Sequence, residues 1–181
     1  YGLLGDARFF TWLEENSSAV LALEPDAIMH AIGRSCEAKA RIVEVDEREA
    51  GKRALLNLGH TFAHAFEAEA GYNSSLLHSE AVAAGLGLAF DLSVDLGICA
   101  SAHATRCKAH LHTVGLPSGQ SDLATGNVPA CRLIEHMKYD KKMRNGKLHF
   151  ILVRAIGDAF VCGDVPLDKV KALLERDQNV V

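Results

Sequence analysis

The chain has 181 residues, of which 49% are hydrophobic and 23% are charged, and its formal net charge is −4. This length suits one large domain or two small ones, with enough apolar material for a substantial core. The basic residues are scattered and no apolar run is long enough to cross a bilayer, so we expect neither nucleic acid nor membrane as a partner, but a small anionic ligand.

The first quarter of the chain predicts three helices. Asp6 can cap a helix that carries several aromatic residues and ends near Asn16, and the serine pair that follows begins a second helix. Pro25 suits the first turn of a third helix, whose apolar residues recur at a spacing near 3.6 as far as about Val45.

The next segment predicts a helix that starts among glycine and histidine residues. Asn57 is expected to cap it, so that Gly59 and His60 lie in its first turn, and Gly71 is expected to stop it. A glycine at such a start allows a ligand or another backbone to approach closely, and the free N–H groups there attract anions.

A second helix is expected from Glu80 to about Leu96, capped by Ser79 and ended by Gly97. Its residues are apolar on all sides, and a helix of that kind is buried on all sides. We therefore expect it to lie at the centre of the fold.

The remainder of the chain predicts further helices and one β-hairpin. His110 and His112 do not share a helix face and are expected at the surface. The pair Asn145 and Gly146 is a hairpin turn signal. The fold class that we expect is mainly α, a multi-helix domain with a small β-hairpin near the C-terminus. The expected elements are helices at about 101–114, 130–139 and 166–176 and strands at 148–153 and 159–162.

The cysteines are odd in number, widely spaced and without a C-x-x-C pair. A disulfide framework is therefore not expected, and a reducing, cytoplasmic location fits better. We expect each thiol to be a small buried hydrophobe. The residues are Cys36, Cys99, Cys107, Cys131 and Cys162.

Three histidines carry the strongest chemical signal. His60 and His64 are four residues apart and point the same way on a helix, and His78 begins the following helical run. A catalytic zinc takes three protein ligands and keeps one open position, and neutral imidazole suits it. The metalloprotease pattern needs glutamate after the first histidine, and Thr61 excludes it. On the residues alone, a metal site and a set of packed structural histidines both stay open.

Several cationic residues accompany these histidines and favour an anionic ligand. Arg53 offers a planar fork to a carboxylate or phosphate, and Lys39, Lys141 and Lys142 offer point charges. The plainer alternative for each is a charge on a solvated helix face or end.

Two blocks of sequence resemble the 3-dehydroquinate synthase family. They are Arg53-x-x-Leu-Asn57-Leu-Gly-His60-Thr-Phe-x-His64-x-x-Glu67 and Leu77-His78-x-Glu80-Ala-Val. The family usually has glycine at the positions of Ala63 and Ser79, but each adds only a small side chain. The resemblance covers nearly all of residues 1–181 and implies a helical metal- and substrate-binding domain. It also implies an N-terminal NAD-binding α/β domain that is absent from this chain, which begins at Tyr1 as if cut in mid-sequence.

The resemblance implies a role for each of these residues. His60 and His78 would be metal ligands, with a third ligand, a glutamate, in a segment upstream of Tyr1. His64 would lie by the substrate phosphate and aid proton transfer, and Asn57 would also touch that phosphate. Arg53 and Lys39 would bind the substrate carboxylate. Either Lys141 or Lys142 would bind another anionic oxygen of the substrate.

The implied reaction is the conversion of 3-deoxy-D-arabino-heptulosonate 7-phosphate to 3-dehydroquinate and phosphate in the shikimate pathway. The implied cofactors are NAD and a divalent metal, zinc or cobalt. The intact enzyme is expected to be a cytoplasmic homodimer, whereas this chain alone is expected to be inactive and to bind zinc weakly.

Three alternatives stay open beside this expectation. Another sugar-phosphate cyclase would keep the metal motif and differ in substrate. A metal-dependent alcohol or glycerol dehydrogenase would give a net redox product and need no phosphate contacts. A non-catalytic helical domain would hold the histidines as packing residues and bind no stoichiometric metal.

Overall fold

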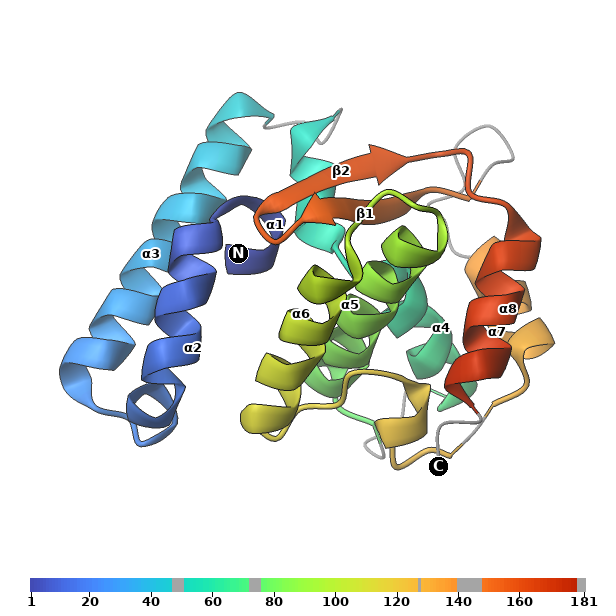
Figure 1. The fold of residues 1–181 in the computed structure, drawn as a ribbon, viewed down its shortest axis with the longest axis horizontal. Helices are drawn as coiled ribbons and strands as arrows, with labels where there is room; N and C mark the ends of the chain where they lie inside the picture. Colours follow the sequence, from blue (N-terminus) through green and yellow to red (C-terminus); the bar gives the residue numbers. More distant parts are fainter. Residues whose placement is uncertain (47–50, 72–75, 127, 140–147, 179–181) are drawn as a thin grey trace.

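The structure, a computed structural model, describes residues 1–46, 51–71, 76–126, 128–139 and 148–178. Figure 1 shows a mainly helical fold with one two-stranded hairpin, as the sequence predicted. The helices are α1 (Gly2–Gly5), α2 (Ala7–Leu21), α3 (Pro25–Val45), the 3-10 helix η1 (Lys52–Asn57), α4 (His60–Glu69), α5 (His78–Asp95), α6 (Ser101–Thr113), the 3-10 helix η2 (Gln120–Asp122), α7 (Ala130–Tyr139) and α8 (Leu167–Asp177). The strands are β1 (Phe150–Ala155) and β2 (Asp158–Cys162).

Helix α5 is the central helix, as its apolar sequence predicted. It packs against α4, α6, α8 and strand β1. Its small residues bring neighbouring backbone very close: a Cβ added at Gly87 would lie 1.9 Å from the carbonyl oxygen of Ser118. Ser93 joins the helix to the hairpin, because its buried hydroxyl accepts a hydrogen bond of 3.1 Å from the N–H of Val153.

The hairpin holds the start of the chain. Strands β1 and β2 pair antiparallel, and Gly157 in their connecting turn has a φ of +85°, a conformation that favours glycine. The N–H of Gly157 donates a 2.8 Å hydrogen bond to the carbonyl oxygen of Leu3. The turn therefore fixes α1 beside the hairpin. The predicted turn residues Asn145 and Gly146 lie outside the described residues.

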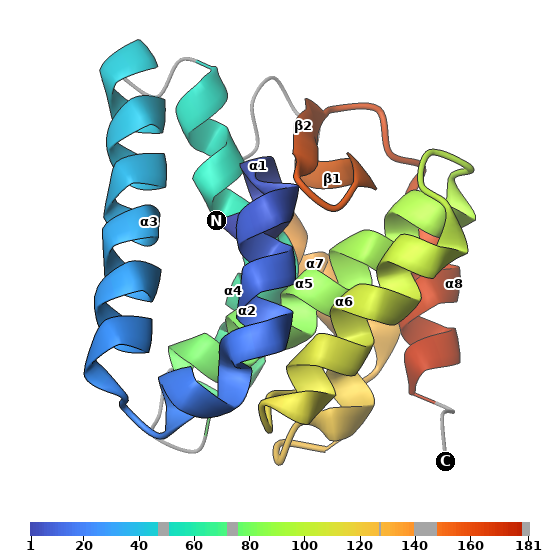
Figure 2. The ribbon, with the colours of Figure 1, turned by 60° about the vertical axis from the view of Figure 1, so that its left-hand side comes forward.

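Helices α2 and α3 form a pair at one edge of the molecule (Figure 2). Helix α3 packs against α2 and η1, and it has the predicted bounds. The predicted break near Asn16 is wrong, because α2 is continuous to Leu21. The Asn16 side chain donates a 2.8 Å hydrogen bond to the carbonyl oxygen of Trp12, four residues earlier, and this local bond is compatible with a continuous helix.

Both predicted caps in the middle of the chain are wrong. Asn57 ends η1, and α4 is capped instead by Gly59 in the left-handed conformation, with a φ of +82°. Helix α5 begins at His78, two residues before the predicted start at Glu80. The Glu80 carboxylate accepts a 3.0 Å hydrogen bond from the N–H of Leu77, and this contact makes Leu77 the cap of the helix in place of Ser79.

The burial of the cysteines and of one histidine also differs from expectation. All five thiols are free, but Cys36 and Cys131 are exposed, so those two are not buried hydrophobes. His110 is half-buried, with its ring edge-on to Phe10 at 5.2 Å between centroids, and burial lowers its pKa. His112 is exposed, as predicted. Over the described ranges, each helix is too short or too polar to traverse a lipid bilayer.

Candidate metal and substrate site

The position of His60 is set by two glycines. Gly59 and Gly85 lie where the start of α4 meets the middle of α5, and a Cβ added at Gly85 would lie 2.2 Å from the carbonyl oxygen of Gly59. The left-handed Gly59 turns the chain into α4 at this contact. His60, the first residue of α4, is therefore held close to the body of α5.

Three imidazoles meet at this point. The ring centroids of His60 and His64 are 5.7 Å apart at 86°, as expected for neighbours one turn apart. The ring of His78, from the first turn of α5, lies 5.6 Å from that of His60 at an interplanar angle of 62°. The structure thus brings together the three histidines that the sequence singled out, from two helices.

The separation of His60 and His78 suits a shared metal ion. A zinc-bound imidazole nitrogen lies 2.0–2.1 Å from the ion, which puts each ring centre roughly 3 Å away, and two such centres about 5 Å apart in a tetrahedral site. The 5.6 Å between these two rings is close to that value.

Both rings are hydrogen-bonded through the same nitrogen, Nδ1. Nδ1 of His60 lies 3.3 Å from the carbonyl oxygen of Leu58, and Nδ1 of His78 lies 2.8 Å from Oε1 of Glu67. Carbonyl and carboxylate oxygens only accept, so each Nδ1 carries a hydrogen; in the neutral imidazole, the form that binds a metal, the lone pair is then on Nε2. This is the arrangement typical of metal-binding histidines.

The described residues do not complete a metal site by themselves. Among them no group of three or more His, Cys, Asp or Glu side chains could hold a metal ion. His60 also forms part of the wall of an otherwise mostly apolar cavity of about 210 Å³. The lining residues are Tyr1, Leu3, Leu4, Leu56, Leu58, His60, Val82 and Leu86.

The candidate substrate residues lie on elements next to the histidines. Arg53 is half-buried in η1, and its N–H donates a 2.8 Å hydrogen bond to Asp46, which anchors the start of η1. Asn57 ends the same helix, three residues before His60. Lys39 is exposed on α3, which packs against η1. Lys141 and Lys142 lie outside the described residues.

Sequence reasoning missed the roles of two glutamates on α4. Glu67, present in the quoted motif, contacts His78, and Glu69 contacts His136 and Arg132 of α7 at 2.9 and 3.1 Å. Spacing within α4 shows which helix face each occupies, but their partners are 11 or more residues away. Only the packing of α4 against α5 and α7 reveals them.

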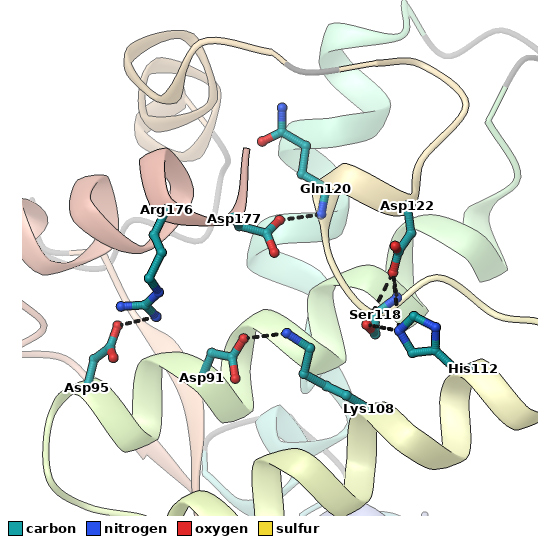
Figure 3. A network of polar contacts seen from close by, with 9 residues as sticks. All are labelled: Asp91, Asp95, Lys108, His112, Ser118, Gln120, Asp122, Arg176 and Asp177. Carbon is teal, nitrogen blue, oxygen red and sulfur yellow. Dashed lines mark hydrogen bonds and ion pairs between the residues drawn. The ribbon is translucent and has the colours of Figure 1, made fainter. Parts of the chain in front are cut away.

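Sequence reasoning also missed a polar network that joins η2 and α8 to α5 and α6 (Figure 3). Lys108 pairs with Asp91 at 2.8 Å and Arg176 with Asp95 at 2.8 Å. Buried Asp177 accepts the N–H of Gln120 at 2.6 Å, and burial raises the pKa of its carboxyl.

A cavity of about 460 Å³ is lined in part by Asp91, Lys108 and His112 of this region, and by none of the predicted site residues. Its Lys108 cation is already neutralised by Asp91 at 2.8 Å, and His112 lies 2.7 Å from Ser118. We read this region as the structural tie that fastens the η2 loop and α8 to the central helix.

Comparison with known proteins shows what this chain is similar to. The family described as 3-dehydroquinate synthase C-terminal matches residues 1–143. A 3-dehydroquinate synthase from Caulobacter vibrioides is 52% identical over 99% of this chain and 49% of its own length, and one from Ruegeria sp. is 51% identical over 97% and 47%. The chain thus spans about half the length of the curated relatives it matches.

Solved structures show the same fold. A 2-epi-5-epi-valiolone synthase from Streptomyces hygroscopicus, with NAD+ and Zn2+ bound, superimposes with a TM-score of 0.82 at 24% identity, over 97% of this chain and 47% of that one. A 2-deoxy-scyllo-inosose synthase complexed with carbaglucose-6-phosphate, NAD+ and Co2+ gives a TM-score of 0.67 at 18% identity, over 84% and 42%.

Proposed function

Since this chain belongs to the 3-dehydroquinate synthase family, we propose that it is the metal- and substrate-binding half of an enzyme that makes 3-dehydroquinate from 3-deoxy-D-arabino-heptulosonate 7-phosphate. The observation that carries the proposal is the approach of His60 and His78, whose ring centroids lie 5.6 Å apart and whose rings are each hydrogen-bonded through Nδ1.

His60 and His78 would hold a divalent metal, which is zinc or cobalt in the related cyclase structures. When held by these two histidines, the metal would supply a Lewis acid for the hydroxyl and carbonyl oxygens of the substrate. NAD is present in the same two structures. In this enzyme it would be held by a preceding α/β domain and would supply the chemistry of hydride exchange with the substrate. The third metal ligand would come from a segment that precedes Tyr1 in the intact enzyme, and this is supported by the position of Tyr1, which lines the same cavity as His60.

The protein's own residues would bind the rest of the substrate. Arg53 and Lys39, on packed elements, would hold the carboxylate, and Asn57 would contact the phosphate. His64 is half-buried one turn from His60, where it can take or give a proton at the phosphate or its neighbouring carbon. Lys141 or Lys142 would hold another anionic oxygen.

Metal content tests this proposal most directly. In the full-length enzyme we expect one zinc per chain, lost on His60→Ala or His78→Ala and retained on His30→Ala, an exposed histidine on α3. Zinc measured after gel filtration and chelator treatment reports the result. Stoichiometric zinc in the His60→Ala variant would refute the ligand assignment.

The division of the protein into two halves has its own test. The 181-residue chain alone should show no turnover of the heptulosonate phosphate, because the NAD site and one metal ligand would be missing. Product formation by the isolated chain would contradict the proposed division. A homodimer and a cytoplasmic location also stay predictions, to be checked by sedimentation and by fractionation.

A different sugar-phosphate cyclase is the second candidate, because the valiolone synthase shares this fold. The two differ in whether the substrate carries a carboxylate. Loss of one charged hydrogen bond costs about 1.5–3 kcal/mol, so Arg53→Ala should raise the KM for a carboxylate substrate roughly 10- to 100-fold. An unchanged KM would favour a substrate without a carboxylate. Steady accumulation of NADH with a polyol would instead indicate a dehydrogenase.

A further inference from the structure

We propose that Glu67 is a positioning residue that orients His78 for the metal, an inference that rests on the proposed function. Oε1 of Glu67 lies 2.8 Å from Nδ1 of His78. Glu67 comes three residues after His64 and seven after His60 on α4, so all three side chains share one helix face. The carboxylate therefore reaches across from the helix of one proposed ligand to fix the ring of the other.

His78 needs such a contact more than His60 does. The side chain of His78 is 61% exposed at the first residue of α5, whereas that of Glu67 is 16% exposed. An exposed imidazole on its own samples several rotamers and both tautomers, and only some of these direct Nε2 towards the ion. The nearly buried carboxylate selects the tautomer with hydrogen on Nδ1 and holds the ring plane.

The two ligands are oriented by different kinds of acceptor. For His60 the acceptor is the main-chain carbonyl of Leu58 at 3.3 Å, next to the backbone contact at Gly59. For His78 it is a side chain, which a single substitution can remove. Changes at Glu67 should thus act on His78 and leave His60 in place.

Glu69 offers a matched control on the same helix. It is 17% exposed and contacts a histidine too, His136 at 2.9 Å, but that histidine lies on α7 and is not a proposed ligand. Substitution of Glu67 or Glu69 removes the same kind of carboxylate–imidazole contact at similar burial. Only the Glu67 substitution should change metal binding.

The experiment compares zinc affinity in the full-length enzyme, measured by competition with a chromophoric chelator. Removal of an outer-shell partner of a metal-binding histidine typically costs 10- to 100-fold in affinity. We expect that loss for Glu67→Ala, a smaller loss for Glu67→Gln, whose amide oxygen still accepts the Nδ1 hydrogen, and no loss for Glu69→Ala. Wild-type affinity in Glu67→Ala would overturn the proposal.

Two further readouts separate positioning from other roles. The 15N shifts of His78 in metal-free protein should show hydrogen on Nδ1 in the wild type and a tautomer mixture in Glu67→Ala, while those of His60 stay unchanged. The visible spectrum of the Co2+ form should keep its band positions and intensity in Glu67→Ala at saturating metal. A changed spectrum, indicating one ligand fewer, would show that Glu67 binds the metal directly and would overturn the positioning role.

These outcomes distinguish the inference from the function beneath it. If the wild-type enzyme binds no zinc, the proposed function fails, whatever the His78 tautomer. If the wild-type enzyme binds zinc and turns over substrate, and Glu67→Ala binds zinc with the same affinity as the wild type, only the role of Glu67 fails.

Discussion

Substitution of Gly85 by alanine should push the two ligand-bearing helices apart. The added Cβ would lie 2.2 Å from the carbonyl oxygen of Gly59 and 3.0 Å from its carbonyl carbon, whereas ordinary van der Waals contact begins at 3.4 Å. These are main-chain atoms that no rotamer change can move away. The start of α4, with His60, must therefore shift by roughly 1 Å relative to α5.

The expected cost combines two opposing terms. Alanine is favoured over glycine by about 1 kcal/mol in a helix interior, and overpacking typically costs about 1–3 kcal/mol. The clash here is with rigid backbone, so we expect the upper end of that range and a net loss of about 2 kcal/mol. For a chain of this size that is a fall in Tm of roughly 4–8 °C.

Two control substitutions isolate the clash. Gly33 lies on α3, and a Cβ there meets nothing within 4 Å, so Gly33→Ala should stabilise the protein by up to about 1 kcal/mol. Gly87 lies on the same helix as Gly85, and a Cβ added there would lie 1.9 Å from the carbonyl oxygen of Ser118. Gly87→Ala should therefore destabilise the protein to a similar degree without displacing His60. Urea unfolding followed by circular dichroism gives the free energies, and zinc competition gives the metal affinity.

Stability and zinc affinity should fall together in only one of these variants. Gly85→Ala should lose both stability and zinc affinity, while Gly87→Ala loses stability alone. If Gly85→Ala is as stable as Gly33→Ala, the close approach of α4 and α5 is not what positions His60.

Three more predictions concern the rest of the fold. The pKa of the Asp6 carboxyl is lowered, first by the hydrogen bond that it accepts from the N–H of Phe9 at the start of α2. The ionised carboxylate therefore stabilises the fold above pH 3.8, and this stabilisation is lost as the pH falls through the lower folded pKa. In urea unfolding at a series of pH values, the stability difference between wild type and Asp6→Asn should shrink over that range. Burial raises the pKa of the Cys107 thiol to about 12. Iodoacetamide at pH 8 should therefore label the exposed Cys131 in the native protein and label Cys107 only after unfolding, as measured by mass spectrometry. Rapid labelling of Cys107 in the native protein would contradict its burial. Ser93→Ala should cost about 1–3 kcal/mol in urea unfolding, because the buried N–H of Val153 loses its acceptor, and a neutral result would mean that the hydroxyl contributes nothing to the hairpin.

Local signals predicted the elements that depend only on local sequence. Pro25 with the 3.6 spacing predicted α3 to its last residue, and the apolar character of α5 predicted its central place. The hairpin followed from two short β-like runs. These features need no knowledge of what lies beside them.

The features that sequence reasoning missed depend on distant partners. Gly59 caps α4 because Gly85 of another helix leaves room for its carbonyl, which no window around residue 59 shows. The shared face of His60 and His64 followed from their spacing, but the approach of His78 came from the family resemblance and not from any local rule. Glu67 was visible as a motif position, yet its contact required the packing of α4 on α5.

The hydrogen bond between Gly157 and Leu3 has a consequence for the order in which the protein is made. The partner of Leu3 in the hairpin turn leaves the ribosome roughly 150 residues after Leu3 does, which is about 8–30 s later at ordinary elongation rates. Until then the first residues of this chain, which share a cavity with His60, lack the strand pair that holds them. The neighbourhood of the proposed metal ligand is thus completed only after the hairpin has been made, so a ribosome-stalled chain that ends before the hairpin should carry the histidines but not their finished surroundings.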